Sequence, residues 1–304
     1  MPCITRQQLK DLVVSTSGAS AVGIGRVAPV SDTAVRQYDE WIADGCHADM
    51  AYLEKYREVR NNPALLLDNA KTIVMTAFSY ANPDAMVYMR RKGSPLIAEY
   101  ALGRDYHKEV RKRLKRTSAE LISLYGGRTR ICVDTAPLRE RYWAERTGLG
   151  FVGLNNYLIV PGVGAHFVLG ALLWTESTAD GYDRPCELDC GKCGACVRAC
   201  PMNALSESGR LDASRCLSYL TIESHLPLNV RALRTNSVFG CDICRKACPH
   251  QPENPPQTNI EAFRARKEVV ELTENDWNEM TAEKFDTLFR DSAIKRAGHR
   301  LIKK

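Results

Sequence analysis

The sequence contains no apolar run long enough to cross a membrane. A spanning helix needs about 20 mostly apolar residues, and no such run occurs in the 304 positions. The chain also opens on MPCITRQQLK, which has no apolar leader of the kind that directs secretion. We therefore expect a cytoplasmic protein with no membrane contact.

Low-complexity segments are absent too, and the charge balance is modest. The chain has 42 Lys and Arg against 36 Asp and Glu, a net charge of +6, and 44% of its residues are hydrophobic. Residues 104–116 carry seven basic side chains against two acidic ones, and residues 290–304 carry six against one. Such runs are commonly solvated helix faces, but together they also suit an anionic partner such as nucleic acid.

Composition divides the chain into three segments. Residues 1–180 alternate apolar, β-rich runs with amphipathic stretches, which predicts an α+β domain around one sheet. Residues 181–255 are rich in cysteine, and residues 256–304 form a polar, basic segment that we expect to be helical. The strands are predicted at 21–25, 71–79, 129–133, 157–160 and 166–174.

Eight of the twelve cysteines lie between positions 190 and 248, in two unequal copies of one pattern. The first copy has the spacing C-x2-C-x2-C-x3-C-P of bacterial ferredoxins, in which three thiolates bind one iron-sulfur cluster and the fourth binds the other. The second copy lacks its first cysteine, because the register places Val238 there, and Cys216 is the nearby thiol that replaces it. The pattern predicts one [4Fe-4S] cluster on Cys190, Cys193, Cys196 and Cys248, and a second on Cys200, Cys216, Cys241 and Cys244.

Disulfides and zinc are the alternatives for these thiols. A disulfide framework is disfavoured because nothing in the sequence indicates an oxidising compartment. Two C-x2-C pairs suit tetrahedral zinc as well, but the closing C-x3-C-P of both copies favours iron-sulfur clusters.

A G-x-G-x-x-G pattern spans residues 148–153. In dinucleotide-binding folds this fingerprint follows a strand and opens a helix. Here we predict the reverse order, with a helix over 137–147 before it and a strand over 157–160 after it. We therefore expect no Rossmann site, and we assign the glycines to tight turns or to close backbone approach.

Four stretches resemble the epoxyqueuosine reductase family over nearly the whole chain. They are VDTAPLRERYWAERTGLGFVGLNNYLIV at 133–160, CLSYLTIE at 216–223, GCDICRKACP at 240–249 and SAIKRAGH at 292–299. The resemblance implies a nitroreductase-like cobalamin-binding domain over 1–180, a double [4Fe-4S] ferredoxin-like domain over 181–255 and a short helical tail over 256–304. Reductive dehalogenases, which pair the same cofactors, are the nearest competitor, and a ferredoxin-type electron carrier or a flavin-dependent reductase are further alternatives.

The resemblance also implies the reaction. Epoxyqueuosine at the wobble position of tRNA would be reduced to queuosine by cob(I)alamin, with electrons from the two clusters. Asp134 matches the family's proton donor. To donate a proton near neutral pH, its pKa must rise by about 3 units from about 3.9. From spacing alone, Asp134 is equally well explained as a cap of the helix predicted to begin near Pro137.

Cobalamin contacts follow from the resemblance only. They are expected at Arg57, Asp134, Arg141, Gly153, Asn155, Leu158, Ser218, Cys241 and Asp242. No D-x-H-x-x-G motif is present, so a histidine ligand below the cobalt is not expected. Accordingly, His107, His166 and His225 are expected to be hydrogen-bonded structural residues.

The implied partners are a tRNA anticodon stem-loop and an external one-electron donor such as a flavodoxin or ferredoxin, acting on a monomer. Many relatives continue past the SAIKRAGH segment into helical repeats, whereas this chain stops at Lys304. We therefore expect tRNA to be held by the catalytic segments and the basic tail. Plausible phosphate contacts are Lys108, Arg111, Lys112 and Arg116.

Overall fold

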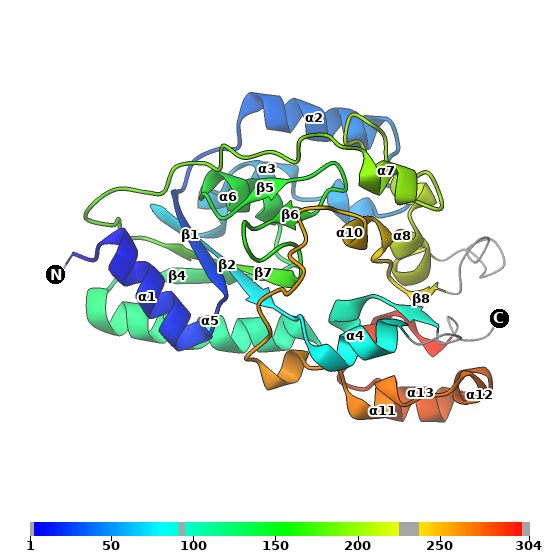
Figure 1. The fold of residues 1–304 in the computed structure, drawn as a ribbon. Coiled ribbons are helices and arrows are strands. Elements are labelled where there is room, and N and C mark those ends of the chain that lie inside the picture. Colours follow the sequence, from blue (N-terminus) through cyan, green and yellow to red (C-terminus); the bar gives the residue numbers. More distant parts are fainter. Residues whose placement is uncertain (1–2, 91–94, 225–236, 300–304) are drawn as a thin grey trace.

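A four-stranded antiparallel sheet, with strand order β1-β2-β7-β4, lies at the centre of the molecule (Figure 1). The computed structural model describes residues 3–90, 95–224 and 237–299. The four strands are β1 (Ala21–Arg26), β2 (Thr72–Ser79), β4 (Thr129–Cys132) and β7 (Phe167–Trp174). Ser79 pairs with Phe167, so the end of β2 and the start of β7 lie together.

Both faces of this sheet are covered, because successive side chains of β2 enter different apolar clusters. Ile73 and Met75 pack with α6 (Glu140–Arg146). Val74 points to the opposite face and packs with α1 (Arg6–Ser17) and α5 (Tyr106–Tyr125). This alternation with a period of two explains why all eight residues of β2 are buried.

Local signals define the two helices on that face. α1 begins with a capping box between Thr5 and Gln8 and ends at Gly18, whose φ of 74° favours glycine. α5 begins after Asp105, whose side chain accepts a hydrogen bond from the backbone N–H of His107 at 3.0 Å. Tyr106 in the first turn of α5 packs in one apolar cluster with Phe78 of β2 and with Tyr80, so the start of α5 lies near the end of β2.

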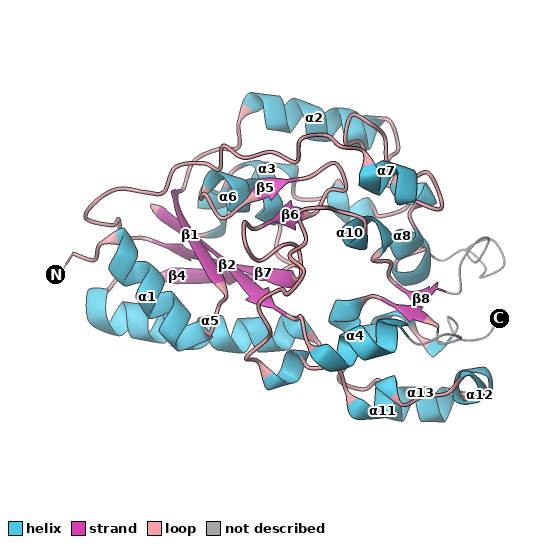
Figure 2. Ribbon diagram, in the orientation of Figure 1, coloured by secondary structure: helices cyan, strands magenta, loops and turns pink. Residues whose placement is uncertain are grey.

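Short helices carry the cysteine-rich segment (Figure 2). They are α7 (Ala195–Ala199), α8 (Leu217–Ile222) and α10 (Ile243–Lys246). Strand β8 (Ser237–Phe239) pairs in parallel with β3 (Leu96–Ile97), so this segment is hydrogen-bonded to the first.

The C-terminal segment is part of the core. Phe285 and Phe289 pack in one apolar cluster with Tyr88, Ile97 and Phe239, which come from both preceding segments. The three segments share this apolar cluster. The division of the chain into domains at residues 180 and 255 stays a prediction. The remaining helices and strands are α2 (Asp32–Ala43), α3 (Arg57–Asn61), α4 (Pro83–Arg90), β5 (Phe151–Val152), β6 (Leu158–Ile159), α11 (Lys267–Val270), α12 (Glu274–Asn278) and α13 (Ala282–Leu288).

All five predicted strands are present, as β1, β2, β4, β6 and β7. The helix predicted over 137–147 is wrong at its start, because α6 begins only at Glu140. Between Val133 and Glu140 the backbone makes tight turns, in which Thr135 N–H bonds to Val133 and Leu138 N–H bonds to Ala136. Among the described residues, no helix combines the length and the apolar character that crossing a membrane requires.

The glycine pattern at 148–153 serves the packing of the chain on itself. It follows helix α6 and includes β5, which is the predicted reverse of the dinucleotide-binding order. A Cβ added at Gly150 would overlap the carbonyl oxygen of Ile159 on the paired strand β6. Close approach of two backbones therefore accounts for Gly150.

Candidate active site

A cavity of about 520 Å³ lies where the end of β2, the start of β7, the start of α5 and the cysteine-rich segment meet. Tyr80 after β2, Phe167 in β7 and Tyr106 in α5 form part of its wall. Asp134 enters from the loop after β4, and Arg141 enters from α6. The lining is mainly apolar and aromatic with a few polar groups, as is usual for a cofactor site.

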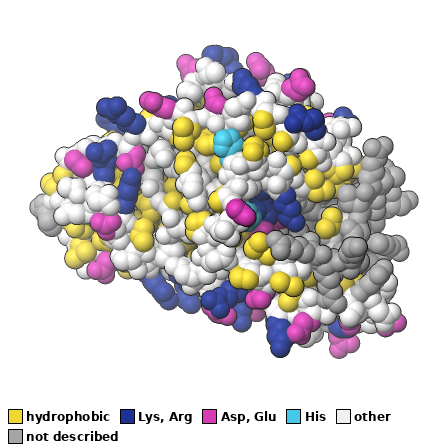
Figure 3. Space-filling model, in the orientation of Figure 1, with side chains coloured by type: hydrophobic (Ala, Val, Ile, Leu, Met, Phe, Trp, Pro, Cys, Tyr) yellow, Lys and Arg dark blue, Asp and Glu magenta, His cyan; other side chains and the backbone are white. Residues whose placement is uncertain are grey.

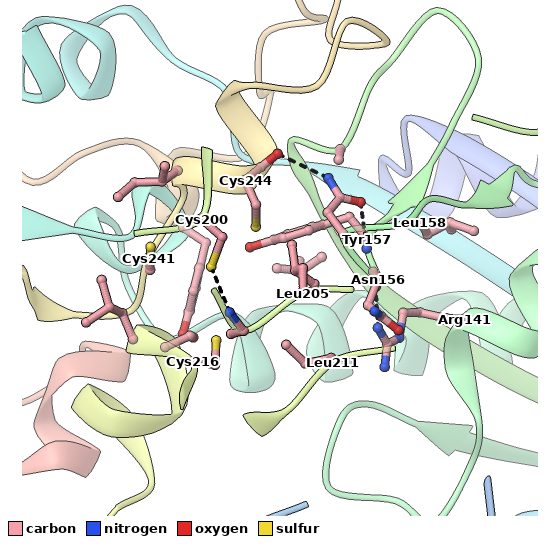
Figure 4. A pocket seen from close by; sticks show the side chains of 18 of the residues that line it. Arg141, Asn156, Tyr157, Leu158, Cys200, Leu205, Leu211, Cys216, Cys241 and Cys244 are labelled. Atoms are coloured by element: carbon pink, nitrogen blue, oxygen red, sulfur yellow. Dashed lines mark hydrogen bonds between the residues drawn. The ribbon is translucent and has the colours of Figure 1, made fainter. Parts of the chain in front are cut away.

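One wall of this cavity carries four thiols, which are the set predicted for the second cluster: Cys200, Cys216, Cys241 and Cys244. Figure 4 shows them on the side opposite Arg141 and Leu158. Burial raises the pKa of the Cys241 thiol to about 11 and raises that of Cys244 as well. Because ligation requires thiolates, bound iron must supply the positive charge that favours them.

The other four cysteines line a separate small pocket with Gly153 and His250, and they are the set predicted for the first cluster: Cys190, Cys193, Cys196 and Cys248. Among the described residues, no three Cys, His, Asp or Glu side chains are close enough to hold a single metal ion. The assignment of individual ligands stays a prediction.

Asp134 lies at the edge of the cavity in an unusual backbone conformation, with φ of 45°. Its backbone N–H donates to Glu140 Oε1 at 2.9 Å, and its carboxylate Oδ2 lies 2.8 Å from His107 Nε2. The N-cap of α6 is Arg139, so the alternative that Asp134 caps this helix is wrong. The strained turn instead directs the carboxylate to His107 beside the cavity.

His107 is bonded on both sides. Its Nδ1 lies 2.7 Å from Asp105 Oδ1, and its ring stacks on Tyr106 with centroids 4.0 Å apart. Burial lowers the pKa of His107, but the hydrogen bonds to Asp105 and Asp134 outweigh burial and raise it to about 9. The expectation that His107 is hydrogen-bonded is confirmed, but its contact with Asp134 was not predicted. His225 lies outside the described residues.

Glu140 is a second acid in this cavity. Burial and the charge of Asp134 raise its pKa to about 8, so Glu140 carries a proton at neutral pH. Neither Glu140 nor the four lining tyrosines (Tyr80, Tyr100, Tyr106 and Tyr157) was predicted for this site. The sequence offered no signal for them, because their convergence depends on tertiary structure.

The predicted cofactor contacts divide into two groups. Six of them line the cavity: Asp134, Arg141, Asn155, Leu158, Ser218 and Cys241. Arg141 Nη1 donates to the carbonyl of Asn156, and Asn155 Nδ2 donates to the carbonyl of Cys244 at 3.3 Å. The loop at 155–158 thus links the arginine side of the cavity to the thiol side.

The other three predicted contacts are not among the residues that line this cavity. Arg57 is paired with Asp39 on the surface. Gly153 lines the small pocket of the first cysteine set. Asp242 is buried and accepts from Arg245 Nη2 at 2.9 Å and from the backbone N–H of Glu99 at 2.8 Å. Their roles toward a cofactor stay predictions.

Two family models match the chain. The model described as Epoxyqueuosine reductase QueG, DUF1730, matches residues 60–135. The model described as a 4Fe-4S double cluster binding domain matches residues 189–251. The second match includes all eight cysteines of the two sets.

Similar proteins cover nearly the whole chain. The epoxyqueuosine reductase of Cellulophaga algicola is 30% identical over 99% of this chain and 97% of its own length. That of Synechococcus sp. strain CC9605 is 35% identical over 92% of this chain and 86% of its own length. A crystal structure of epoxyqueuosine reductase with an epoxyqueuosine-modified tRNA stem loop matches with a TM-score of 0.84 and 27% identity, covering 98% of this chain and 78% of that one.

Proposed function

Because the chain belongs to the epoxyqueuosine reductase family, we propose that it is an oxidoreductase that converts epoxyqueuosine in tRNA to queuosine. One observation carries the proposal: the predicted acid Asp134 and four cysteines of the cluster pattern line a single cavity. The relatives are named for this reaction and not for dehalogenation. A function in electron transfer alone, as in a ferredoxin, would not explain the cavity or the acidic side chains around it.

The chemistry sets the requirements for the site. In converting an epoxide to an alkene, both C–O bonds break and one C=C bond forms. The oxygen leaves as water after taking up two protons, and two electrons enter. Side chains of a protein do not supply such electrons, so redox cofactors must deliver them.

The cofactors are two [4Fe-4S] clusters and cobalamin. The double-cluster family match and the two sets of four thiols support the clusters. The cavity fits cobalamin because it is roomy, largely aromatic and apolar, and has thiols on one wall. When bound there, cobalamin supplies reducing power that amino acids lack.

The residues of the chain then have separate tasks. Cys200, Cys216, Cys241 and Cys244 hold the cluster nearer the cavity, so electrons reach the cavity from that wall. Asp134, in the lining of the cavity, is assigned as the acid that protonates the departing epoxide oxygen. Arg141 is fixed by the carbonyl of Asn156 and orients the cofactor from the opposite side.

Substrate binding is assigned to the exposed side of α5. This helix starts at the cavity with Tyr106, and Lys108, Arg111, Lys112 and Arg116 on its following turns are exposed. Lys and Arg side chains gather along the lower edge of the face in Figure 3, in the region of α5. A tRNA stem loop whose wobble base enters the cavity would place its phosphates over this surface.

The remaining inferences concern the electron donor and the oligomeric state. The first cysteine set includes the exposed Cys193, so an external one-electron donor such as a flavodoxin or ferredoxin would deliver electrons there. We infer that the protein acts as a monomer in the cytoplasm, where its tRNA substrate is found.

The test is direct. The protein is purified without oxygen and loaded with cobalamin. It is then reduced and incubated with an epoxyqueuosine-modified stem loop, and the nucleosides are identified by mass spectrometry. We expect a corrin absorption spectrum and formation of queuosine. Bound flavin, or a bound corrin without formation of queuosine, would contradict the proposal.

A further inference from the structure

The reaction takes up two protons, whereas one carboxyl group holds one. Each turnover therefore needs a second proton, either from another donor or from renewed protonation of Asp134. Among the described residues, the Asp134 carboxylate contacts the proton-bearing side chain of His107, whose Nε2 lies 2.8 Å from Oδ2. The opposite nitrogen, Nδ1, lies 2.7 Å from Asp105 Oδ1.

We propose that Asp105 and His107 form a relay that returns a proton to Asp134 during reduction of the epoxide. This inference rests on the proposed function and adds the source of the second proton. In the step, the N–H bond of His107 Nε2 breaks and an O–H bond forms on Asp134 Oδ2. Asp105 stabilises the imidazolium before transfer, and solvent reprotonates the imidazole afterwards. The two electrons come from the clusters and do not pass through the relay.

The geometry around His107 suits proton transfer to Asp134 better than a purely structural role. His107 lies in the first turn of α5, and Asp105 caps that helix through the backbone N–H of His107 at 3.0 Å. The imidazole ring is further held by stacking on Tyr106. His107 is therefore fixed on a 20-residue helix, whereas Asp134 lies in a strained turn that its own backbone bond to Glu140 maintains. A rigid donor beside a carboxylate at the cavity edge is what efficient proton transfer requires.

The pKa of His107 sets the pH range in which the relay can supply a proton. With a pKa of about 9, His107 is protonated at neutral pH and loses its proton only as the pH rises through that value. The other charged and titratable groups around the pair are Asp105 and Lys108 at the start of α5, Glu140 and Arg141 on α6, Tyr100 and Tyr106 in the cavity lining, and Tyr52. Glu140 is protonated below about pH 8 and so adds no negative charge beside Asp134 at neutral pH.

Two variants test the relay in the cobalamin-loaded protein. His107→Gln keeps a polar side chain but removes the titratable proton. Asp105→Asn keeps a good helix cap but removes the charge that holds the imidazolium. We expect the wild-type turnover number to hold up to about pH 9. In His107→Gln it should fall by about 100-fold at pH 8 and recover toward wild type at pH 6, because solvent protons then replace the relay. Asp105→Asn should shift the alkaline limit to lower pH.

A matched control and a second measurement separate a relay from a structural role. His47 forms a similar pair, with Nε2 2.7 Å from Glu54 Oε1, and it does not line the cavity. His47→Gln should therefore leave the shape of the pH profile unchanged. In ¹⁵N spectra of the oxidised protein, both ring nitrogens of His107 should carry protons at pH 8, and Asp105→Asn should lower the midpoint of this titration.

The outcomes distinguish the two proposals. If wild type forms queuosine but His107→Gln has the same turnover number and pH profile, the relay is wrong and the proposed function stands. A loss in His107→Gln that is equal at all pH values also contradicts the relay, because a purely structural effect would not depend on proton supply. If wild type forms no queuosine, the proposed function itself fails.

Discussion

The roles of Asp134 and His107 could be predicted from the sequence to different extents. Asp134 was predicted from its resemblance to a family proton donor, and its place on the cavity rim agrees with that role without testing it. His107 was assigned only a structural role, because its partner lies 27 positions further along the chain. The bond between them forms because α5 and β4 pack side by side, and no local pattern encodes that contact.

Gly150 gives a prediction at the same scale. A methyl group at Gly150 would overlap the carbonyl oxygen of Ile159, which is backbone and cannot turn aside. Gly150→Ala should therefore lower the stability by about 3 kcal/mol. Gly162→Ala is the control, since its Cβ would meet no atom within 4 Å and only its φ of 75° is unfavourable, at about 1 kcal/mol. Thermal unfolding of both variants at one scan rate measures the difference. Equal midpoints would contradict the account of Gly150.

Among the helices and strands, long apolar runs were a reliable guide to the buried strands. β2 and β7 were predicted from apolar runs, and both are present with nearly the expected bounds. The start of α6 was wrong because Pro137 suggested a helix, whereas the backbone from Val133 to Glu140 makes short turns instead. Those turns place Asp134 at the cavity, so the local rule failed at a site where the chain is under strain.

We predict that basic side chains of helix α5 bind the phosphates of tRNA. Replacing Lys112 and Arg116 together with Ala should weaken binding of the stem loop and reduce the slope of log affinity against log salt by up to about 2. Fluorescence anisotropy at several salt concentrations measures both quantities. Arg26→Ala is the control, because Arg26 is exposed at the opposite end of the sheet, paired with Thr72. A salt slope that is unchanged in the double variant would remove α5 from the binding surface.

In the whole molecule, the eight cysteines line two separate pockets in the two predicted sets of four, whereas their assignment as cluster ligands stays a prediction. The spacing within each run is local, but each set also takes a cysteine from elsewhere in the chain, which the ferredoxin pattern supplies. The cluster shared by Tyr88, Phe239 and Phe285 joins all three segments and was not predicted. An apolar residue in the sequence predicts that its side chain will be buried, but it does not predict which distant residues will pack against it.

Cys216 tests how the two clusters are divided. Cys216→Ser should remove one ligand of the cluster beside the cavity, so the iron content should fall from about eight to about four atoms per chain. Cys186→Ser is the control, because Cys186 packs with Cys190 and Cys248 but belongs to neither predicted set. Iron analysis with electron paramagnetic resonance of the reduced protein reports the remaining cluster. Loss of iron in Cys186→Ser, or full iron in Cys216→Ser, would contradict the division.

The proposed function requires that Asp134 act as the acid when epoxyqueuosine is reduced in this cavity. The most direct measurement compares wild type with Asp134→Asn, both loaded with cobalamin and clusters, in a single turnover on the modified stem loop. We predict unchanged corrin and cluster spectra in both proteins, formation of queuosine by wild type and a loss of at least about 100-fold in the variant. Formation of queuosine by Asp134→Asn at the wild-type rate would contradict the account.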